Sequence, residues 1–242
     1  MDWRKKLSGA EFFSALNLDK GSVVSLVGAG GKTTMMFTLA KLGKSLGLRV
    51  LVTTSTRILI PQTADYDYIN LSGIPHCVGD QPCICVFGQK CESSHKMQGL
   101  DENLLADIIV DFDLVLIEAD GSNCKPLKGW KETEPVVPFC TTHTLGIFDL
   151  SVVHQKINES VVHRLPLFLE LTAMETGNSL QPLHVGRIVN GKRGLFQYAV
   201  GERILFLNKL ETIDSQRLVE EIECFVQVKT LTGSLHEAIY YA

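Results

Sequence analysis

The stretch Val23-Val24-Ser25-Leu26-Val27-Gly28-Ala29-Gly30-Gly31-Lys32-Thr33-Thr34 decides how the rest of the chain is interpreted. A short apolar run that ends at glycines predicts a buried parallel strand, and the apolar spacing from Met35 to Leu46 predicts a helix. Glycines leave backbone N–H groups free to point at an anion, and the start of a helix adds the positive end of its dipole. The order of strand, glycine loop and helix therefore predicts a phosphate-binding loop.

The residues of this loop match the roles needed to bind a nucleoside triphosphate. Lys32 is expected to reach the terminal phosphates, and the Thr33 hydroxyl is expected to bind Mg²⁺. GTP and ATP are both compatible with the loop. The residues predicted to surround the nucleotide are Gly28, Ala29, Gly30, Gly31, Lys32, Thr33 and Thr34.

The loop is a shortened variant of the Walker A pattern. That pattern places a glycine at the position of Leu26, whereas the first glycine here is Gly28. A dinucleotide-binding fingerprint would need a glycine at the position of Thr33 and has no use for Lys32 under the pyrophosphate. The triphosphate interpretation is therefore favoured over a Rossmann cofactor site.

Length, composition and net charge indicate the general class of protein. With 242 residues, of which 45% are hydrophobic, the chain suits one α/β domain over residues 1–242. A net charge of -4 argues against a general nucleic-acid surface, and no apolar run approaches the roughly 18 residues of a membrane span. We expect a cytoplasmic protein that binds neither nucleic acid nor membrane and whose seven cysteines are mostly thiols.

Two further strands are predicted to end at polar residues that belong to the same site. The apolar run 114–117 leads into Glu118-Ala119-Asp120-Gly121, an acidic strand end of the Walker B type that holds Mg²⁺. An earlier strand, over residues 49–53, leads into a hydroxyl cluster that contains Thr54. Ligands bind at the carboxyl ends of strands in open α/β sheets, so we expect Glu118, with Thr54, to lie at the metal and Asp120 to take part in catalysis.

Residues 61–100 interrupt the alternation of strands and helices and predict a small β-rich insertion. Four cysteines lie in this segment and could either form a zinc site or be buried thiols. The spacings contain none of the two-residue gaps of a zinc knuckle, so we expect less than stoichiometric zinc, although metal binding stays open. The four are Cys77, Cys83, Cys85 and Cys91, with His76 and His95 beside them.

Near the end of the chain, a strand over residues 203–207 leads into Asn208-Lys209-Leu210-Glu211. P-loop GTPases read guanine with Asn-Lys-x-Asp after a strand, and here the carboxylate is one methylene longer. Asn208, Lys209 and Glu211 are therefore predicted to contact the base of the nucleotide. The last residues, 234–241, are predicted to form a short helix.

The loop that follows the acidic turn supplies candidate anion-binding groups. Lys125 and Lys128 could hold an anionic substrate near the terminal phosphate, or they could be solvated lysines. His163 and Arg164, in a helix-like stretch, could supply a titratable group and a phosphate clamp, or make ordinary polar contacts. Cys124 is more simply explained as a bystander thiol than as a ligand for a soft element.

Taken together, these motifs resemble the YqeC family over residues from about 20 to 211. The resemblance is carried by the glycine loop, the Thr-Thr-Ser-Thr run, Glu-Ala-Asp-Gly-Ser, Pro-Leu-Lys, Glu-Pro-Val-Val-Pro, His163-Arg164 and Asn208-Lys209. Ser55, Leu165 and Glu211 depart from the usual family pattern. The family is described as accessory to selenium-dependent molybdenum hydroxylases, so the resemblance implies a role for a selenium species or the molybdenum cofactor and for a client hydroxylase.

The expected fold is therefore a doubly wound, mostly parallel α/β sheet of the P-loop NTPase type. The favoured function is Mg²⁺-dependent hydrolysis or transfer from a nucleoside triphosphate, coupled to maturation of the hydroxylase cofactor. One alternative is an ATP-dependent ligase or kinase that acts on a small anionic substrate. Another is a nucleotide-gated carrier that does not rely on catalysis.

Overall fold

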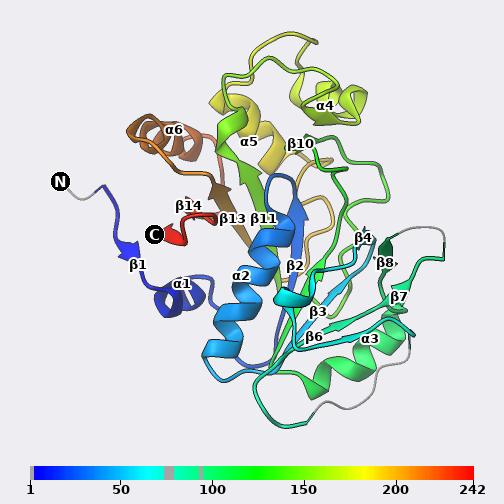
Figure 1. The fold of residues 1–242 in the computed structure, drawn as a ribbon. Helices are drawn as coiled ribbons and strands as arrows, with labels where there is room; N and C mark the ends of the chain where they lie inside the picture. The colour runs from blue at the N-terminus through cyan, green and yellow to red at the C-terminus, as the bar shows by residue number, and fades with distance from the viewer. Residues whose placement is uncertain (1–2, 74–78, 93–94) are drawn as a thin grey trace.

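The computed structural model describes residues 3–73, 79–92 and 95–242, and shows a mixed α/β protein built on one large sheet (Figure 1). The order of strands in this sheet is β1-β15-β14-β13-β11-β2-β9-β3-β6-β5. Pairing is parallel from β14 through β5, and only β15 and β1 are added antiparallel at one edge. The expectation of a large, mostly parallel sheet is thereby confirmed. The strands are β1 (Lys6–Leu7), β2 (Ser22–Gly28), β3 (Val50–Thr54), β5 (Tyr68–Asn70), β6 (Ile84–Phe87), β9 (Leu114–Glu118), β11 (His143–Asp149), β13 (Glu202–Asn208), β14 (Lys229–Ser234) and β15 (Ile239–Tyr241).

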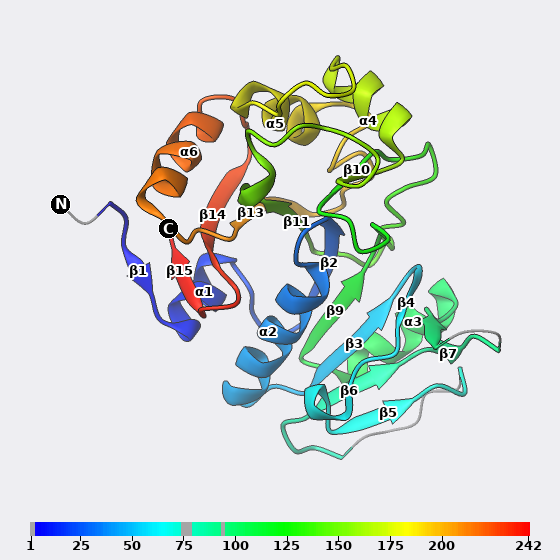
Figure 2. The same cartoon turned by 45° about the horizontal axis from the view of Figure 1, so that its top comes forward.

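Helices cover both faces of the sheet. On one face α1 and α2 pack against a core that includes Val24 and Leu26 of β2. On the other face α3 covers β9, while α5 and α6 cover β13 and α4 packs on α5. Figure 2 shows α4, α5 and α6 gathered along the half of the sheet that holds β13 and β14. The helices are α1 (Gly9–Ala15), α2 (Lys32–Ser45), α3 (Glu102–Ile108), α4 (Leu165–Thr172), α5 (Pro182–Asn190) and α6 (Ile213–Glu223).

The central strands are buried on both faces, which explains their continuous apolar sequence. Every residue of β2, β3 and β9 is buried. The carboxyl ends of β2, β9, β11 and β13 lie at one edge of the sheet, because these strands are parallel neighbours. None of the helices in the described ranges is long and apolar enough to cross a membrane.

The stretch 61–100 is divided between two sheets and is not one separate insertion. β5 and β6 extend the main sheet as parallel strands. The remaining strands, β7 (Gln89–Lys90) and β8 (Lys96–Gln98), pair with β4 (Arg57–Leu59) in the antiparallel order β4-β8-β7. We call these three strands the small sheet.

The small sheet is pressed onto the carboxyl end of β3. A Cβ atom added to Gly99 would lie 1.6 Å from the carbonyl oxygen of Thr54, so only glycine permits this approach. Ile58 and Met97 of the small sheet are buried in the core beneath it. The small sheet is therefore held in a defined place beside the ends of the central strands.

Two local predictions are wrong. Residues 234–241 do not form a helix: a turn leads into β15, which pairs with β14 and closes that edge of the sheet. His163 ends the short strand β12 (Val162–His163), which pairs with β10 (Leu127–Lys128), and Arg164 precedes α4 in the left-handed conformation with φ of 60°. In both places pairing with a distant segment decides the local structure.

Candidate nucleotide site

The glycine loop lies between β2 and α2, and its shape depends on its glycines. Gly28, Gly30 and Gly31 have φ values of 99°, 80° and 139°, which residues other than glycine rarely adopt. A Cβ atom at Gly30 would lie 2.4 Å from Cβ of Asp149, and one at Gly31 would lie 2.5 Å from Nδ2 of Asn208. The loop is thus packed between the ends of two neighbouring strands, β11 and β13.

The backbone of the loop is available to an anion. Within the described ranges, the N–H groups of residues 30–34 donate to no protein acceptor. The same residues line a cleft of about 660 Å³ at the carboxyl edge of the sheet. Free N–H groups at the start of a helix of this length form an anion-binding surface.

Lys32, Thr33 and Glu118 lie together at the start of α2. The Thr33 hydroxyl donates to Oε2 of Glu118 at 2.8 Å. Nζ of Lys32 donates to the carbonyl oxygen of Gly28 at 2.7 Å and lies 3.9 Å from Oε1 of Glu118. The structure therefore brings together the lysine, the hydroxyl and the carboxylate that the sequence assigned to one site.

Burial raises the pKa of Glu118, which is further raised by the charge of Asp120 and lowered by Lys32 and the Thr33 hydrogen bond. Burying a carboxylate disfavours its charged form unless a positive charge compensates it. A divalent cation at this position would add that compensation. Thr33 and Glu118 offer a hydroxyl and a carboxylate oxygen, the ligand types that Mg²⁺ prefers when waters and phosphates complete its shell.

Asp120 is fully buried behind the loop. Its Oδ2 accepts from the N–H of Gly28 at 3.2 Å and from Nε1 of Trp130 at 2.9 Å. Its Oδ1 accepts no hydrogen bond from the described residues and lies 3.4 Å from Nζ of Lys32. Asp120 thus holds the loop and its lysine in place.

Lys128 does not reach the cleft. Its side chain is fully buried, and Nζ lies 3.2 Å from Oδ2 of Asp120 and 3.2 Å from Oε2 of Glu134, and donates to the carbonyl of Gly121 at 2.7 Å. The predicted substrate contact is instead an internal ion pair. It joins the acidic turn after β9 to the loop that carries Glu134.

Arg164 and His163 also lie on this internal network. Arg164 holds both carboxylate oxygens of Glu134, one of them at 2.8 Å. Burial acts against the charged form of Glu134, but the Arg164 hydrogen bond and Lys128 keep its pKa below its usual value. Burial and the charges of Arg164 and Lys128 lower the pKa of His163. Neither His163 nor Arg164 lines the cleft, so the structure does not bring these two predicted catalytic residues to the phosphates.

Two further residues that the sequence assigned to the site, Lys125 and Thr54, bond to backbone carbonyl groups. Lys125 lines the cleft, but its Nζ donates to the carbonyls of Glu159 and Val162. The Thr54 hydroxyl donates to the carbonyl of Glu118 at 2.7 Å and accepts from the N–H of Thr56. Thr54 thus fixes the end of β9, and it is not among the residues that line the cleft.

Asn208 links the glycine loop to the segment that follows β14. Its Nδ2 donates to the carbonyl of Gly30 at 2.9 Å, and its Oδ1 accepts from the N–H of Leu235 at 3.2 Å. Lys209 lines the cleft and pairs with Asp149 at 2.6 Å. Glu211 is exposed and is not among the residues that line the cleft.

Several residues of the site were missed in the sequence. Asp149 ends β11 as a fully buried carboxylate beside the loop, and its signal was another apolar run that ends in an acid. Trp130 bonds to Asp120, which no local pattern indicates. Arg57 and Lys96, from the small sheet, also line the cleft.

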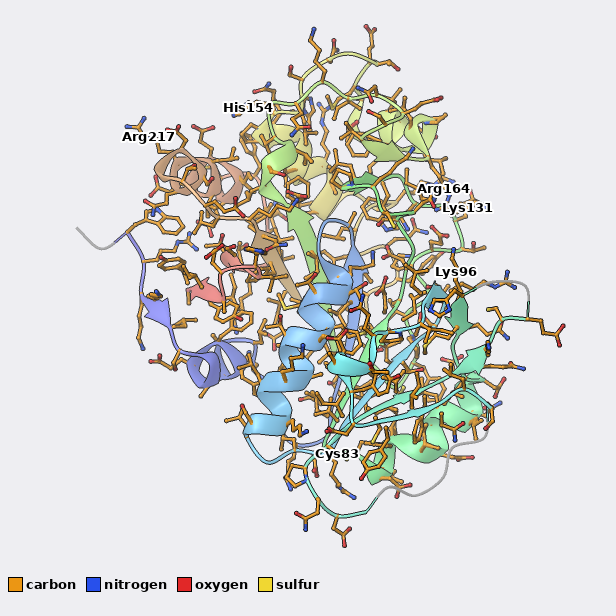
Figure 3. All side chains as sticks on the ribbon, viewed as in Figure 1. Cys83, Lys96, Lys131, His154, Arg164 and Arg217 are labelled. Carbon is orange, nitrogen blue, oxygen red and sulfur yellow. The ribbon has the colours of Figure 1, made fainter. Side chains whose placement is uncertain are left out.

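Cys124 is among the residues that line the cleft, whereas Cys83 and Cys85 lie away from it. Cys83 and Cys85 are buried with their sulfurs 3.5 Å apart, and Figure 3 shows Cys83 at the opposite end of the sheet from Lys96. Cys77 and His76 lie outside the described residues. Within the described ranges, no group of three or more His, Cys, Asp or Glu side chains is arranged to hold a metal ion.

Comparisons with known proteins give one consistent result. The family model described as YqeC protein matches residues 24–166. The chain is 29% identical over 214 residues to a protein of Escherichia coli (strain K12) called "Uncharacterized protein YqeC", covering 84% of this chain and 83% of the relative. No solved structure matches.

Proposed function

The chain belongs to the YqeC family, and we propose that it is a P-loop NTPase-type protein that binds a nucleoside triphosphate with Mg²⁺ and hydrolyses or transfers its terminal phosphate. One observation carries the proposal. The free N–H groups of the glycine loop, Lys32 and the Thr33–Glu118 pair all meet in one cleft.

Each group has a separate part in this proposal. The loop N–H groups bind the phosphate oxygens, which they can do without breaking any hydrogen bond of the described structure. Thr33 and Glu118 would hold Mg²⁺, which supplies charge neutralisation on the phosphates. Lys32 adds a positive charge at the terminal phosphate, where charge builds up as the phosphoryl group leaves.

In hydrolysis, the water oxygen forms a bond to the terminal phosphorus, the bond from phosphorus to the bridging oxygen breaks, and a proton is released to solvent. Positioning and electrostatic stabilisation dominate such reactions, so a fixed loop matters. Asp120 and Asn208 hold the loop from both sides. In transfer, an acceptor oxygen takes the place of water.

The base preference is part of the proposal. Asn208 follows a parallel strand beside the loop, as a guanine-reading residue would, but its amide is engaged with Gly30 and Leu235. Glu211 lies outside the cleft lining. Because neither side chain is placed to read the base in this structure, the proposal keeps GTP and ATP as alternative nucleotides.

The biological setting rests on the family resemblance alone. Members are described as accessory to selenium-dependent molybdenum hydroxylases, which supports a role in maturing their cofactor. The cleft is lined by cations of the small sheet as well as by the glycine loop, which supports a second anionic ligand beside the nucleotide. A carrier without rapid turnover would use the same binding groups.

A thermal-shift titration with GTP, ATP and CTP, each with and without Mg²⁺, tests the proposal. A ligand that binds only the folded state stabilises it by roughly 2.7 kcal/mol at a hundredfold excess over its Kd. We expect stabilisation by GTP or ATP that requires Mg²⁺ for its full size. No stabilisation by any of the three nucleotides would refute the proposal.

A further inference from the structure

We infer that the small sheet forms a second anion-binding subsite, in which Arg57 and Lys96 hold a phosphate group of a second substrate in the same cleft as the glycine loop. This inference rests on the proposed function, because it assigns the rest of the same cleft. Lys125 and Lys128 were expected to hold an anionic substrate; Arg57 and Lys96, which no motif indicated, take that role here.

The pairing of the small sheet places these side chains on one face of the sheet. In the antiparallel pair β4–β8, Ile58 lies opposite Met97, and Leu59 lies opposite Lys96. Ile58 and Met97 are buried in the core. Because side chains alternate between the two faces of a strand, Arg57, Leu59 and Lys96 share the other face. All three line the cleft, and so does Ile58.

Arg57 and Lys96 are the cations of the cleft that remain available. Lys32 donates to Gly28, Lys125 to two backbone carbonyls, and Lys209 to Asp149. Within the described ranges, the side chains of Arg57 and Lys96 form no hydrogen bond or ion pair, and both are exposed. Figure 3 shows Lys96 at the upper edge of the small sheet, beside β4.

The pattern of charge favours a phosphate. Arg57 and Lys96 are diagonal neighbours on the ladder, roughly 7–8 Å apart or somewhat less between their Cβ atoms, so both long side chains can reach one group. Two positive charges match the charge of about -1.5 to -2 on a phosphate monoester at neutral pH. The guanidinium adds a planar pair of donors suited to phosphate oxygens. Leu59, 59% exposed between them, offers apolar contact to the carbon skeleton of such a substrate.

The nucleotide itself is assigned to the glycine loop. In the proposal its phosphates are bound by the N–H groups of residues 30–34 and by Lys32, which line the cleft together with the small sheet. Arg57 and Lys96 are not among the groups assigned to the nucleotide phosphates, although they line the same cleft of about 660 Å³. The subsite is therefore expected to stay open when the glycine loop is filled.

The test titrates inorganic phosphate into protein saturated with a non-hydrolysable GTP analogue and Mg²⁺, so that the terminal phosphate position is occupied. Phosphate binding is measured by calorimetry for the wild type, Arg57→Ala, Lys96→Ala and the double variant. Lys90→Ala is the matched control, because Lys90 is an exposed lysine of the same small sheet that does not line the cleft. Affinity for the analogue is measured for each protein separately.

We expect phosphate to bind the loaded wild type and the Lys90 variant, and each single substitution to weaken it about tenfold. The double variant should lose phosphate binding, while its affinity for the analogue changes less than threefold. Equal losses for analogue and phosphate would overturn the inference by assigning Arg57 and Lys96 to the nucleotide. Phosphate binding that is absent in the wild type or unchanged in the double variant would also overturn it. Failure of the analogue to bind any protein would instead refute the proposed function.

Discussion

The hydroxyl of Thr33 donates a 2.8 Å hydrogen bond to the carboxylate of Glu118, although 85 positions separate the two residues in the sequence. The pair forms because β2, which leads into Thr33, and β9, which ends at Glu118, are adjacent parallel strands. Parallel neighbours bring their carboxyl ends to the same edge of the sheet. A hydroxyl and a carboxylate therefore meet beside the loop whose N–H groups are free.

Replacing Glu118 by Gln tests this pair. Gln keeps the shape and an oxygen that can accept from Thr33, but it removes the negative charge. We expect the affinity for Mg²⁺-nucleotide to fall by about 2 kcal/mol, since a charged contact is lost, while nucleotide binding in EDTA changes little. Equilibrium titration with and without Mg²⁺ measures both.

The control for this substitution is Glu175→Gln, at an exposed glutamate outside the cleft, which should leave both affinities unchanged. Equal losses with and without Mg²⁺ in Glu118→Gln would mean that the carboxylate is structural.

We predict that Asn208 supports nucleotide binding by holding the glycine loop in place and not by contacting the base. Asn208→Ala removes the bond to the carbonyl of Gly30 and the acceptor for the N–H of Leu235, which should cost about 2 kcal/mol of unfolding free energy. It should also weaken GTP and ATP by the same factor, because both need the loop. Denaturant unfolding and nucleotide titration check the two effects.

Asn190 offers a matched control for Asn208. Its side chain makes a similar pair of bonds, to the carbonyl of Phe225 at 2.7 Å and from the N–H of Gln227 at 3.2 Å, away from the cleft. Asn190→Ala should lower stability without changing nucleotide affinity. A loss confined to GTP in Asn208→Ala would show that this side chain reads guanine after all.

Glu134 should stabilise the protein in a pH-dependent manner. It compensates the fully buried Lys128 and pairs with Arg164, so Glu134→Gln should cost about 3 kcal/mol at pH 7. Its pKa is below the ordinary 4.5 in the folded protein. The contribution is therefore complete at neutral pH and is lost as the pH falls through the folded pKa, below about 4.5.

The measurement is urea unfolding of wild type and Glu134→Gln between pH 3 and 7. Their difference in stability should be constant at the neutral end and shrink at the acid end. Glu132→Gln is the control, because Glu132 pairs with Arg193 at an exposed position and should change stability little at any pH. A difference that grows in acid would contradict the assignment.

The parts of the site that could be predicted are those with a local physical signature. Glycines with positive φ, the apolar run of β2 and the acidic end of β9 each appear in a few consecutive residues. Such segments specify both their own structure and the edge of the sheet at which they end. The loop, Lys32, Thr33 and Glu118 were all located this way.

The parts that could not be predicted depend on pairing between distant segments. Gly146 lies within β11. A Cβ atom there would lie 2.7 Å from side-chain atoms of Leu195 and Phe196, so packing against a distant segment explains this glycine and a local pattern does not. Lys128 follows the acidic turn as a surface lysine would, yet Asp120 and Glu134 surround it. Arg57 and Lys96 reach the cleft only because the small sheet folds over β3.

The central claim is that the glycine loop binds a nucleoside triphosphate, and the most direct test is the affinity of Lys32→Ala for the triphosphate that stabilises the wild type best. Lys44→Ala serves as the control, at the exposed opposite end of the same helix. The account predicts one bound nucleotide per chain in the wild type and in Lys44→Ala, and a loss of at least about 2 kcal/mol, or roughly thirtyfold, in Lys32→Ala. Equal affinity in Lys32→Ala and the wild type would contradict it.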